Sequence, residues 1–363
     1  MDDVALNQSF WQQKRVLVTG HTGFKGSWLC LWLNELGAQV TGIALPPPSE
    51  PSLFNSVNLS EKIDSHIADI CDLANLKRIV EQTQPEIIFH MAAQSLVLQS
   101  YKDPVESYMT NVIGTASVFE ALRGCDSVKA IVNITTDKCY ENKEWHWGYR
   151  ESDPLGGHDP YSSSKACAEL VTATYRKCFF EEAGKPLASV RAGNVIGGGD
   201  WAENRLVPDI VKGILESEVI IVRNPHAIRP WQHVLEPLAG YLSLAEKLSG
   251  SNGAQYAEGW NFGPYENDAR PVEWIAESLC NKWGESASWK IGDQSKTQPH
   301  EATYLKLDCN KARAQLGWKP RLDLDLALEW IVEWYKCYKS EENLSDVSLE
   351  QINRYQTLLG QSR

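Results

Sequence analysis

The sequence predicts an α/β protein built on a doubly wound parallel sheet, with a smaller α/β lobe toward the C-terminus. Two observations favour this fold. In the first half of the chain, short apolar runs alternate with longer amphipathic runs, which is typical of strands covered on both faces by crossover helices. In addition, the first apolar run ends in a glycine-rich turn that opens a helix.

The first elements follow from the apolar runs and from the residues that stop them. The run at 15–19 (RVLVT) predicts a strand, and a helix is expected at 27–36, ending at Gly37. The second strand is expected at 39–44, because three prolines at 46–48 follow it. A third strand at 63–67 precedes a helix at 72–84, whose expected N-cap is Asp72.

The alternation continues to about residue 191. The short runs at 87–90 (IIFH, after Pro85), 130–135 (AIVNIT) and 188–191 predict three further strands, and the long runs at 104–123 and 161–182 predict helices. From about residue 192, Gly, Pro and Trp interrupt shorter elements, which indicates a second lobe with some segments returning to the first. The stretch from about residue 340 is polar, and we expect it to be only partly ordered.

Composition excludes several classes of protein. The chain has 363 residues, of which 43% are hydrophobic and 23% charged, as in ordinary globular proteins. Its net charge of −12 has the wrong sign for nucleic-acid binding. No apolar run approaches the roughly 20 residues of a membrane span, and the first ten residues lack the basic region of a secretory signal. The nine cysteines form no C-x-x-C pair, so we expect reduced thiols, no metal site and a cytoplasmic location.

The glycine-rich turn predicts a dinucleotide-binding loop. Its G-x-x-G-x-x-G spacing lies between a strand and a helix, where a pyrophosphate can rest on backbone N–H groups and the helix N-terminus. The alternative is an ordinary glycine-rich turn. Lys25 could reach a cofactor phosphate or solvent, and both stay open. The residues expected to contact the cofactor here are Gly20, Thr22, Gly23, Phe24, Lys25 and Gly26.

The sequence favours NAD over NADP as the cofactor. No Lys or Arg lies between Gly26 and Lys62, so nothing local could neutralise a 2′-phosphate. The acid that usually binds the ribose is missing from the end of the second strand, and Glu50 is the nearest candidate. Asp69, after the third strand, is placed to meet the adenine, although a surface carboxylate would look the same.

Two motifs predict a catalytic group. Tyr161 and Lys165 are four residues apart, so they share one face of a helix, and a neighbouring ammonium would lower the pKa of the tyrosine. Thr136, in the run TTDK, follows the fifth expected strand, at the sheet edge where ligands bind in parallel sheets. Its hydroxyl could share a substrate oxygen with Tyr161.

Seven motifs along almost the whole chain resemble the extended short-chain dehydrogenase/reductase superfamily, and within it the sugar-nucleotide 4,6-dehydratases. The later motifs are closest to the members that act on CDP-glucose. The motifs are GHTGFKG (20–26), HMAAQS (90–95), TTDKCY (135–140), DPYSSSK (159–165), RAGNVIGGGDW (191–201), IRPWQHVLEP (228–237) and NFGP (261–264).

The resemblance implies a Rossmann-like fold and an internally redox-neutral dehydration in deoxysugar and surface polysaccharide biosynthesis. Tyr161 takes the proton of the C4 hydroxyl while NAD accepts the C4 hydride, Lys165 orients the nicotinamide ribose, and Thr136 binds O4. A base then removes the C5 proton, Asp137 protonates the departing C6 hydroxyl, and the hydride returns to C6. Further cofactor contacts are implied for Ile70, Ala92, Ala93, Gln94, Asn111 and Arg191.

Lys138 departs from the better-known dTDP-glucose enzymes, which resemble this chain but carry Glu at this step. A partly desolvated Lys can titrate low enough to act as the C5 base. The alternative is that Lys138 only pairs with Glu141 or a phosphate.

Residues after 191 supply most of the implied substrate contacts, and Gln94 and Ser95 supply the others. Planar guanidinium groups suit phosphates and Trp offers a stacking face, although Trp201 and Trp231 could equally be packing residues. The implied set is Gln94, Ser95, Asn194, Trp201, Arg205, Leu206, Val207, Arg229, Trp231 and His233.

We therefore divide the chain into an NAD-binding domain (1–191), a mainly nucleotide-sugar-binding domain (192–345) and a polar tail (346–363). The resemblance implies homo-oligomers, dimers or tetramers, formed through helices such as 104–123 and 161–182. A sugar-nucleotide 4-epimerase or a plain reductase is the alternative enzyme. A non-enzymatic dinucleotide sensor is the third hypothesis, against which the complete Thr136, Tyr161 and Lys165 set argues.

Overall fold

A computed structural model describes residues 6–222, 224–284, 287–292 and 304–361. Its centre is a seven-stranded parallel sheet in the order β11-β6-β5-β4-β1-β2-β3, so the predicted parallel α/β fold is confirmed. Residues 1–5, on which the expectation about a secretory signal partly rests, lie outside the described residues. The seven strands are β1 (Arg15–Thr19), β2 (Gln39–Ala44), β3 (Asp64–Ile67), β4 (Ile87–His90), β5 (Ala130–Ile134), β6 (Leu187–Arg191) and β11 (Gly259–Asn261).

Helices cover both faces of this sheet, and alternate residues of each strand face opposite cores. In β1, Val16 and Val18 join the larger core, whereas Leu17 joins the smaller one. The larger core includes residues of α2 (Phe24–Glu35), α10 (Leu235–Leu248), α12 (Leu324–Lys339) and α13 (Leu344–Leu359). The smaller core includes residues of α4 (Leu73–Thr83) and α7 (Thr115–Arg123), with side chains of α8 (Pro160–Tyr175) packed against it.

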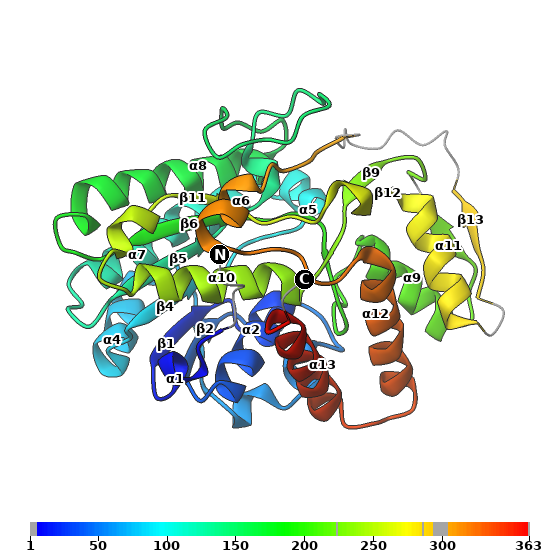
Figure 1. Cartoon of the computed structure of the whole chain (residues 1–363), viewed down its shortest axis with the longest axis horizontal. Coiled ribbons are helices and arrows are strands. Elements are labelled where there is room, and N and C mark those ends of the chain that lie inside the picture. Colours follow the sequence, from blue (N-terminus) through cyan, green and yellow to red (C-terminus); the bar gives the residue numbers. More distant parts are fainter. Residues whose placement is uncertain (1–5, 223, 285–286, 293–303, 362–363) are drawn as a thin grey trace.

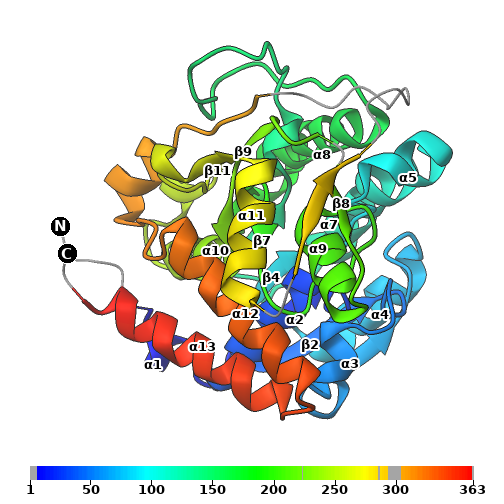
Figure 2. The same ribbon diagram turned by 90° about the vertical axis from the view of Figure 1, so that its right-hand side faces the viewer.

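Short elements after residue 191 form the second lobe, at the right of Figure 1 and facing the viewer in Figure 2. They pair as three small two-stranded sheets, β7–β10, β9–β12 and β8–β13. The strands are β7 (Val195–Ile196), β8 (Ile220–Val222), β9 (Ile228–Pro230), β10 (Gln232–His233), β12 (Ala269–Pro271) and β13 (Trp289–Ile291), with helices α9 (Leu206–Leu215) and α11 (Val272–Trp283). The chain also returns to the first lobe, because β11 pairs with β6 in the main sheet.

The expected helices formed, with two interruptions. The helix at 104–123 is divided into α6 (Pro104–Tyr108), a wider π-helical stretch at Met109–Gly114 and α7, and the helix at 161–182 widens at Arg176–Phe180. Asp72 caps α4 as expected, accepting from the Asn75 N–H. Before residue 191, three short α-helices were not expected, namely α1 (Gln8–Trp11), α3 (Leu53–Ser56) and α5 (Val97–Lys102). After it, no individual helix had been predicted.

The expectation of a partly ordered tail is wrong. Residues 344–359 form the helix α13, whose Tyr355 packs edge-on against Trp32 of α2. Tyr355 also donates to the buried carboxylate of Glu236 on α10, at 2.8 Å. The tail is polar on average, but its apolar residues recur with helical spacing and are buried on the first lobe.

Candidate active site

The glycine-rich turn connects the end of β1 to the start of α2. A Cβ atom at Gly20 would lie 2.7 Å from the Ala92 nitrogen, and one at Gly26 would lie 2.1 Å from the Gly20 oxygen. Gly20 also has a φ of +80°, which favours glycine. The turn therefore presents bare backbone beside the start of a 12-residue helix, which is the arrangement that a pyrophosphate needs.

The segment after β4 is fixed by buried polar contacts. His90 contacts the Thr19 hydroxyl at 2.7 Å and the Thr115 hydroxyl at 3.0 Å, and burial lowers its pKa to about 3, so it stays neutral. Asn111 accepts from the Gln94 N–H and donates to the Gln94 carbonyl, both at 3.0 Å. Asn111 thus holds the loop that carries Gln94 in place through the backbone of that loop.

The end of β5 carries the TTDK run into a short turn. The Thr136 hydroxyl donates to the Asp137 carboxylate at 2.9 Å and accepts from the Lys138 N–H at 3.3 Å. The other carboxylate oxygen of Asp137 is buried and has no hydrogen-bond partner among the described residues. Burial raises the pKa of Asp137, against the opposing effect of the nearby Lys138 and Arg229 cations. A carboxyl group in this setting is suited to hold a proton and to give it up.

Gly193 makes room for the Asp137 carboxylate. A Cβ atom at Gly193 would lie 1.8 Å from Asp137 Oδ2, so no larger residue fits while the carboxylate keeps this position. Gly193 belongs to the RAGN motif, but its role was not recognised from the sequence. Only the three-dimensional neighbourhood of β5 and β6 reveals it.

Tyr161 and Lys165 lie on the first turns of α8, which Asp159 caps through the Ser162 N–H. The predicted lowering of the Tyr161 pKa is not observed. Burial raises the pKa of Tyr161 to about 12, although its hydrogen bond with Thr136 opposes the rise. Lys165 is buried below it and donates to the Ile134 carbonyl at 3.4 Å, and burial together with the nearby Lys25 lowers the Lys165 pKa to about 8.

Arg191, expected as a cofactor contact, instead belongs to a buried ion pair. Its guanidinium binds both carboxylate oxygens of Glu169 at 2.9 Å and donates to the Tyr140 hydroxyl at 2.7 Å. Although burial opposes it, Arg191 holds the pKa of Glu169 below its usual value, so the pair is ionised. Glu169 also accepts from Thr135 and Ser189, so this group ties β5, β6 and α8 together behind Thr136 and Tyr161.

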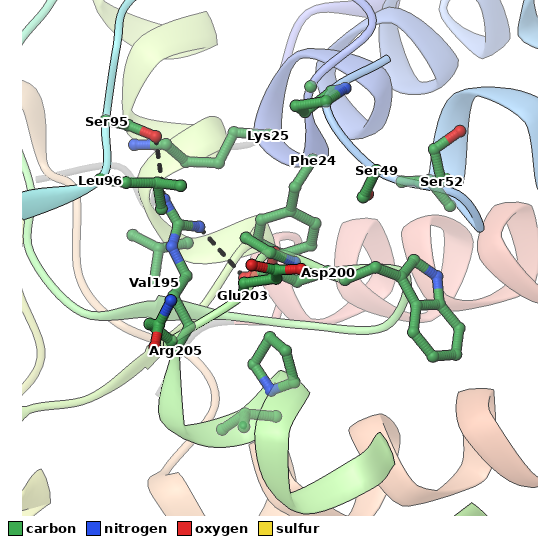
Figure 3. Close-up of a pocket in the computed structure, with 18 of the residues that line it drawn as sticks. Phe24, Lys25, Ser49, Ser52, Ser95, Leu96, Val195, Asp200, Glu203 and Arg205 are labelled. Carbon is green, nitrogen blue, oxygen red and sulfur yellow. Dashed lines mark hydrogen bonds and ion pairs between the residues drawn. The ribbon is translucent and has the colours of Figure 1, made fainter. Parts of the chain in front are cut away.

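In the second lobe, Arg205 bridges the two sides of the site. Its guanidinium donates to the Asp200 carboxylate and to the Ser95 hydroxyl, each at 3.1 Å (Figure 3). Asp200 stands in the GGGDW motif but was not singled out from the sequence. An acid five residues before Arg205 is the signal that could have indicated it.

Both tryptophans of the substrate set have packing as well as pocket contacts. Trp201 packs edge-on against Tyr335, and the Trp231 ring nitrogen donates to the Arg270 carbonyl at 3.1 Å. His233, by contrast, is buried between Trp28 and Trp330, and burial lowers its pKa to about 3. It supports the loop rather than facing the site.

One large cavity joins these elements, with a volume of about 2270 Å³. Pockets for a single small molecule have roughly 300–1,000 Å³, so this cavity has room for a dinucleotide and a nucleotide sugar together. Of the predicted site residues, Asn111, Lys165, Arg191 and His233 do not line it. Those that do are Gly20, Thr22, Gly23, Phe24, Lys25, Gly26, Asp69, Ile70, Ala92, Ala93, Gln94, Ser95, Thr136, Asp137, Lys138, Tyr161, Asn194, Trp201, Arg205, Leu206, Val207, Arg229 and Trp231.

The ribose end of the cavity lacks an acid at the end of β2, as the sequence indicates. Leu45 stands there with 57% of its surface exposed, and Glu50 accepts a hydrogen bond from Asn55 at 2.8 Å. In the described part of the chain, no group of three or more His, Cys, Asp or Glu side chains could hold a metal ion. None of the described helices is long and apolar enough to cross a membrane.

The fold and the site define a Rossmann-like enzyme in which Thr136 and Tyr161 line one cavity and Lys165 lies beside Tyr161 on α8. The chain belongs to the family whose model is described as GDP-mannose 4,6 dehydratase, which matches residues 17–330. The fold matches those of a UDP-glucuronic acid 4-epimerase from Bacillus cereus (TM-score 0.75, 22% identity, covering 89% of this chain and 99% of that one) and a dTDP-glucose 4,6-dehydratase from Bacillus anthracis (0.73, 20%, covering 91% and 99%).

Two curated relatives are also similar over most of their length. A CDP-glucose 4,6-dehydratase from Salmonella typhimurium is 53% identical, over 96% of this chain and 98% of the relative. A dTDP-glucose 4,6-dehydratase from Haemophilus influenzae is 27% identical, over 88% of this chain and 97% of the relative. Membership of a dehydratase family and the α/β fold are thus confirmed.

Proposed function

We propose that the chain converts CDP-glucose to CDP-4-keto-6-deoxyglucose and water. The observation that carries this proposal is that Asp137 and Lys138 line the same cavity as Thr136 and Tyr161. The first two residues can act as the acid and the base of an elimination, and the last two can act in the oxidation of a hydroxyl group. The choice of CDP-glucose rests on the 53% identity to the Salmonella enzyme.

The bare glycine turn and the size of the cavity fit NAD as the cofactor, which when bound takes up the C4 hydride and gives it back at C6. Tyr161 accepts the proton of the C4 hydroxyl, and Thr136 holds that oxygen through its hydroxyl. With its pKa near 8, Lys165 lies below Tyr161 as a cation that favours the phenolate. The hydrogen bond with Thr136 also opposes the burial that raises the Tyr161 pKa.

Elimination then uses the two residues after Thr136. The C4 ketone acidifies the C5 proton, which Lys138 removes. Asp137, whose pKa is raised by burial, protonates the C6 hydroxyl so that water leaves. None of the described residues forms an ion pair with Lys138, and Glu141 lies 4.0 Å from Lys143 instead.

We further infer that the chain forms homo-oligomers. Large apolar side chains are exposed along α5, α6, the Met109–Gly114 stretch and α8, including Val105 (70%), Leu170 (58%) and Ile113 (48%). These elements pack on one another in the first lobe. An apolar surface of this kind favours a protein partner, and a second copy of the chain is the simplest one. We also propose a cytoplasmic location, consistent with nine free thiols.

The proposed function is tested by incubating the protein with NAD and CDP-glucose and then adding alkali. We expect the absorbance of a 4-keto sugar with CDP-glucose, and much less with dTDP-glucose, UDP-glucose or GDP-mannose. NADP should support far less activity than NAD, because no basic residue lies between Gly26 and Lys62. A CDP-hexose product without keto absorbance would instead indicate a 4-epimerase and contradict the proposal.

A further inference from the structure

Lys25 of the glycine-rich turn points into the centre of the site. It is the second residue of α2 and half-buried, and Figure 3 shows its side chain reaching toward Ser95 and Arg205. The charged groups that face it come from three other elements. They are Arg205 and Asp200 before α9, Asp137 after β5 and Lys165 on α8.

These charges leave a local excess of cations. Arg205 is paired with Asp200 at 3.1 Å, and the Asp200 side chain is only 5% exposed, so this carboxylate is already bound. Within the described residues Lys25 makes no ion pair of its own, and Asp137 is buried against Gly193. The wall of the cavity therefore presents an ammonium and a guanidinium near each other, in a protein whose net charge is −12.

Two neighbouring cations repel each other, and the repulsion grows in a partly desolvated cavity. Burial, and secondarily the Arg205 guanidinium, lower the pKa of Lys25 to about 8. An anion with two charges placed between the two groups removes the repulsion and forms charge-assisted hydrogen bonds with both. Arg205 already donates to Ser95, so the pair sits where the first and second lobes meet.

We propose that Lys25 and Arg205 form a diphosphate-binding pair that spans the two lobes, with Lys25 acting on the substrate side of the glycine-rich turn. This inference rests on the proposed function and adds a residue that recognises the diphosphate. Two molecules at this site carry such a group, the nucleotide sugar and the dinucleotide. Lys25 interacts electrostatically with Arg205, which belongs to the expected substrate set, and with Asp137, and this closeness favours the nucleotide sugar.

The test is the affinity of Lys25→Met for CDP and for NAD, each measured by calorimetry at pH 7. Lys25→Arg keeps the charge, and Lys77→Met removes an exposed lysine of α4 as the matched control. We expect Lys25→Met to bind CDP about 10- to 100-fold more weakly, because a hydrogen bond to a charged group is lost. Lys25→Arg should stay within a few-fold of the parent, and Lys77→Met should match it.

The two titrations distinguish the source of the diphosphate. Weaker binding of CDP alone assigns the pair to the nucleotide sugar, and weaker binding of NAD alone assigns it to the dinucleotide. The proposal that Lys25 and Arg205 bind a diphosphate is overturned if Lys25→Met binds CDP and NAD as tightly as the parent. It is also overturned if the parent binds neither of them. A parent that turns over CDP-glucose while Lys25→Met binds normally overturns only this inference, whereas a parent without turnover contradicts the proposed function.

The pH dependence of CDP binding provides a second readout. Lys25 is charged below its pKa, so the affinity of the parent should fall as the pH rises from 7 to 9. The guanidinium of Lys25→Arg stays charged over this range, so its affinity should change much less, although Arg205, Asp200, Asp137 and Lys165 still face position 25. An equal fall in both proteins would assign the titration to Lys165 and count against Lys25.

Discussion

At the scale of single residues, the position of the Asp137 carboxylate depends on the absence of a side chain at Gly193. The carboxylate fills the space that a Cβ atom would take, 1.8 Å from Oδ2, and this same buried oxygen has no hydrogen-bond partner among the described residues. The Thr136 hydroxyl holds the other oxygen. The proposed acid is therefore fixed by the packing of the turn after β5 against the chain after β6.

Gly193→Ala should lower turnover by about 100-fold or more, because a displacement of about 1 Å at a catalytic group can cost this much. The measurement is kcat/KM, with circular dichroism to show that the fold is kept. Gly124→Ala is the matched control, since a Cβ atom at Gly124 meets nothing within 4 Å. Gly193→Ala with the turnover of the control would show that Asp137 is not the acid, or not where the structure has it.

Lys138→Met should lower turnover by about 10²–10⁴, the usual worth of general acid–base assistance. The C4 oxidation step should remain, because Thr136, Tyr161 and Lys165 are intact. In deuterated water, the C5 position should no longer exchange with solvent. In Asp137→Asn, by contrast, C5 exchange should persist while the loss of the C6 hydroxyl slows.

The control for Lys138→Met is Lys143→Met, which removes a lysine of the same loop that is 52% exposed. It should turn over at the rate of the parent. If Lys138→Met exchanges C5 normally, Lys138 is not the base, and contact with a phosphate becomes the better explanation of that residue.

Single residues also mark the limit of the sequence analysis. The spacing of Tyr161 and Lys165 recurs at Tyr335 and Lys339, where the Tyr335 hydroxyl donates to the Asp200 carbonyl at 2.7 Å and has a packing role. Only Tyr161 and Lys165 are accompanied by a polar run at the carboxyl end of a strand, namely the TTDK residues that follow β5. Spacing alone thus does not separate the candidate pair Tyr161 and Lys165 from a packing pair, and their place beside the sheet is also needed. The burial that raises the Tyr161 pKa could not be predicted from spacing.

At the scale of elements, Glu236 connects three segments of the larger core. Its carboxylate accepts from the backbone N–H groups of Arg321 and Leu322, at 2.8 and 2.6 Å, and from the Tyr355 hydroxyl of α13. Burial nevertheless raises the pKa of Glu236 to about 7. The ionised form is therefore less favourable in the folded chain than in the unfolded one.

Glu236→Gln should make stability less dependent on pH. In the parent, the contribution of Glu236 is fully present below pH 4.5, its ordinary pKa, and is lost as the pH rises to about 7. The amide of Gln keeps the accepting oxygen and does not ionise. The thermal midpoint of the variant relative to the parent should thus rise between pH 5 and pH 8, by the equivalent of up to about 3 kcal/mol.

The control for this prediction is Glu35→Gln, which changes an exposed carboxylate at the end of α2. Its midpoint should follow that of the parent at both pH values. If the difference between Glu236→Gln and the parent were the same at pH 5 and pH 8, Glu236 would not titrate in this range.

Elements with a clear apolar pattern in the sequence were the easiest to predict. The strand β1 and the capped helix α4 were expected nearly at their observed bounds, because apolar runs and capping residues act locally. The strand β11 was not expected, since three residues carry no period and its pairing with β6 is a long-range contact. The helix α13 was missed because its average polarity was weighed above the spacing of its buried side chains.

At the scale of the whole molecule, the order of the strands places the glycine turn and residues 136–138 at the same end of the sheet. The glycine turn after β1, the loop after β4 and the turn after β5 end side by side, because these three strands are neighbours. The alternation of strands and helices predicted this end of the sheet. The bridge from Arg205 to Ser95 between the lobes could not be predicted, since it depends on how the second lobe folds back.

The apolar surface of α5, α6 and α8 gives a prediction about assembly. Val105→Glu combined with Leu170→Glu should shift the chain to a monomer of 40.7 kDa, because the charges oppose burial of this surface. Light scattering after gel filtration measures the mass. Val219→Glu, which changes a half-exposed residue of the second lobe, should leave the mass of the parent. A parent that is already monomeric at micromolar concentration would contradict the inferred oligomer.

The most direct test of the account follows a single hydrogen atom. CDP-glucose deuterated at C4 is converted in ordinary water with NAD present, and the product is analysed by NMR. We predict deuterium in the C6 methyl group of a 4-keto-6-deoxy product and no transfer with Tyr161→Phe, which lacks the hydroxyl that accepts the C4 proton. Deuterium that remains at C4, or that is absent from C6 of the product, would contradict an internal oxidation and reduction at this site.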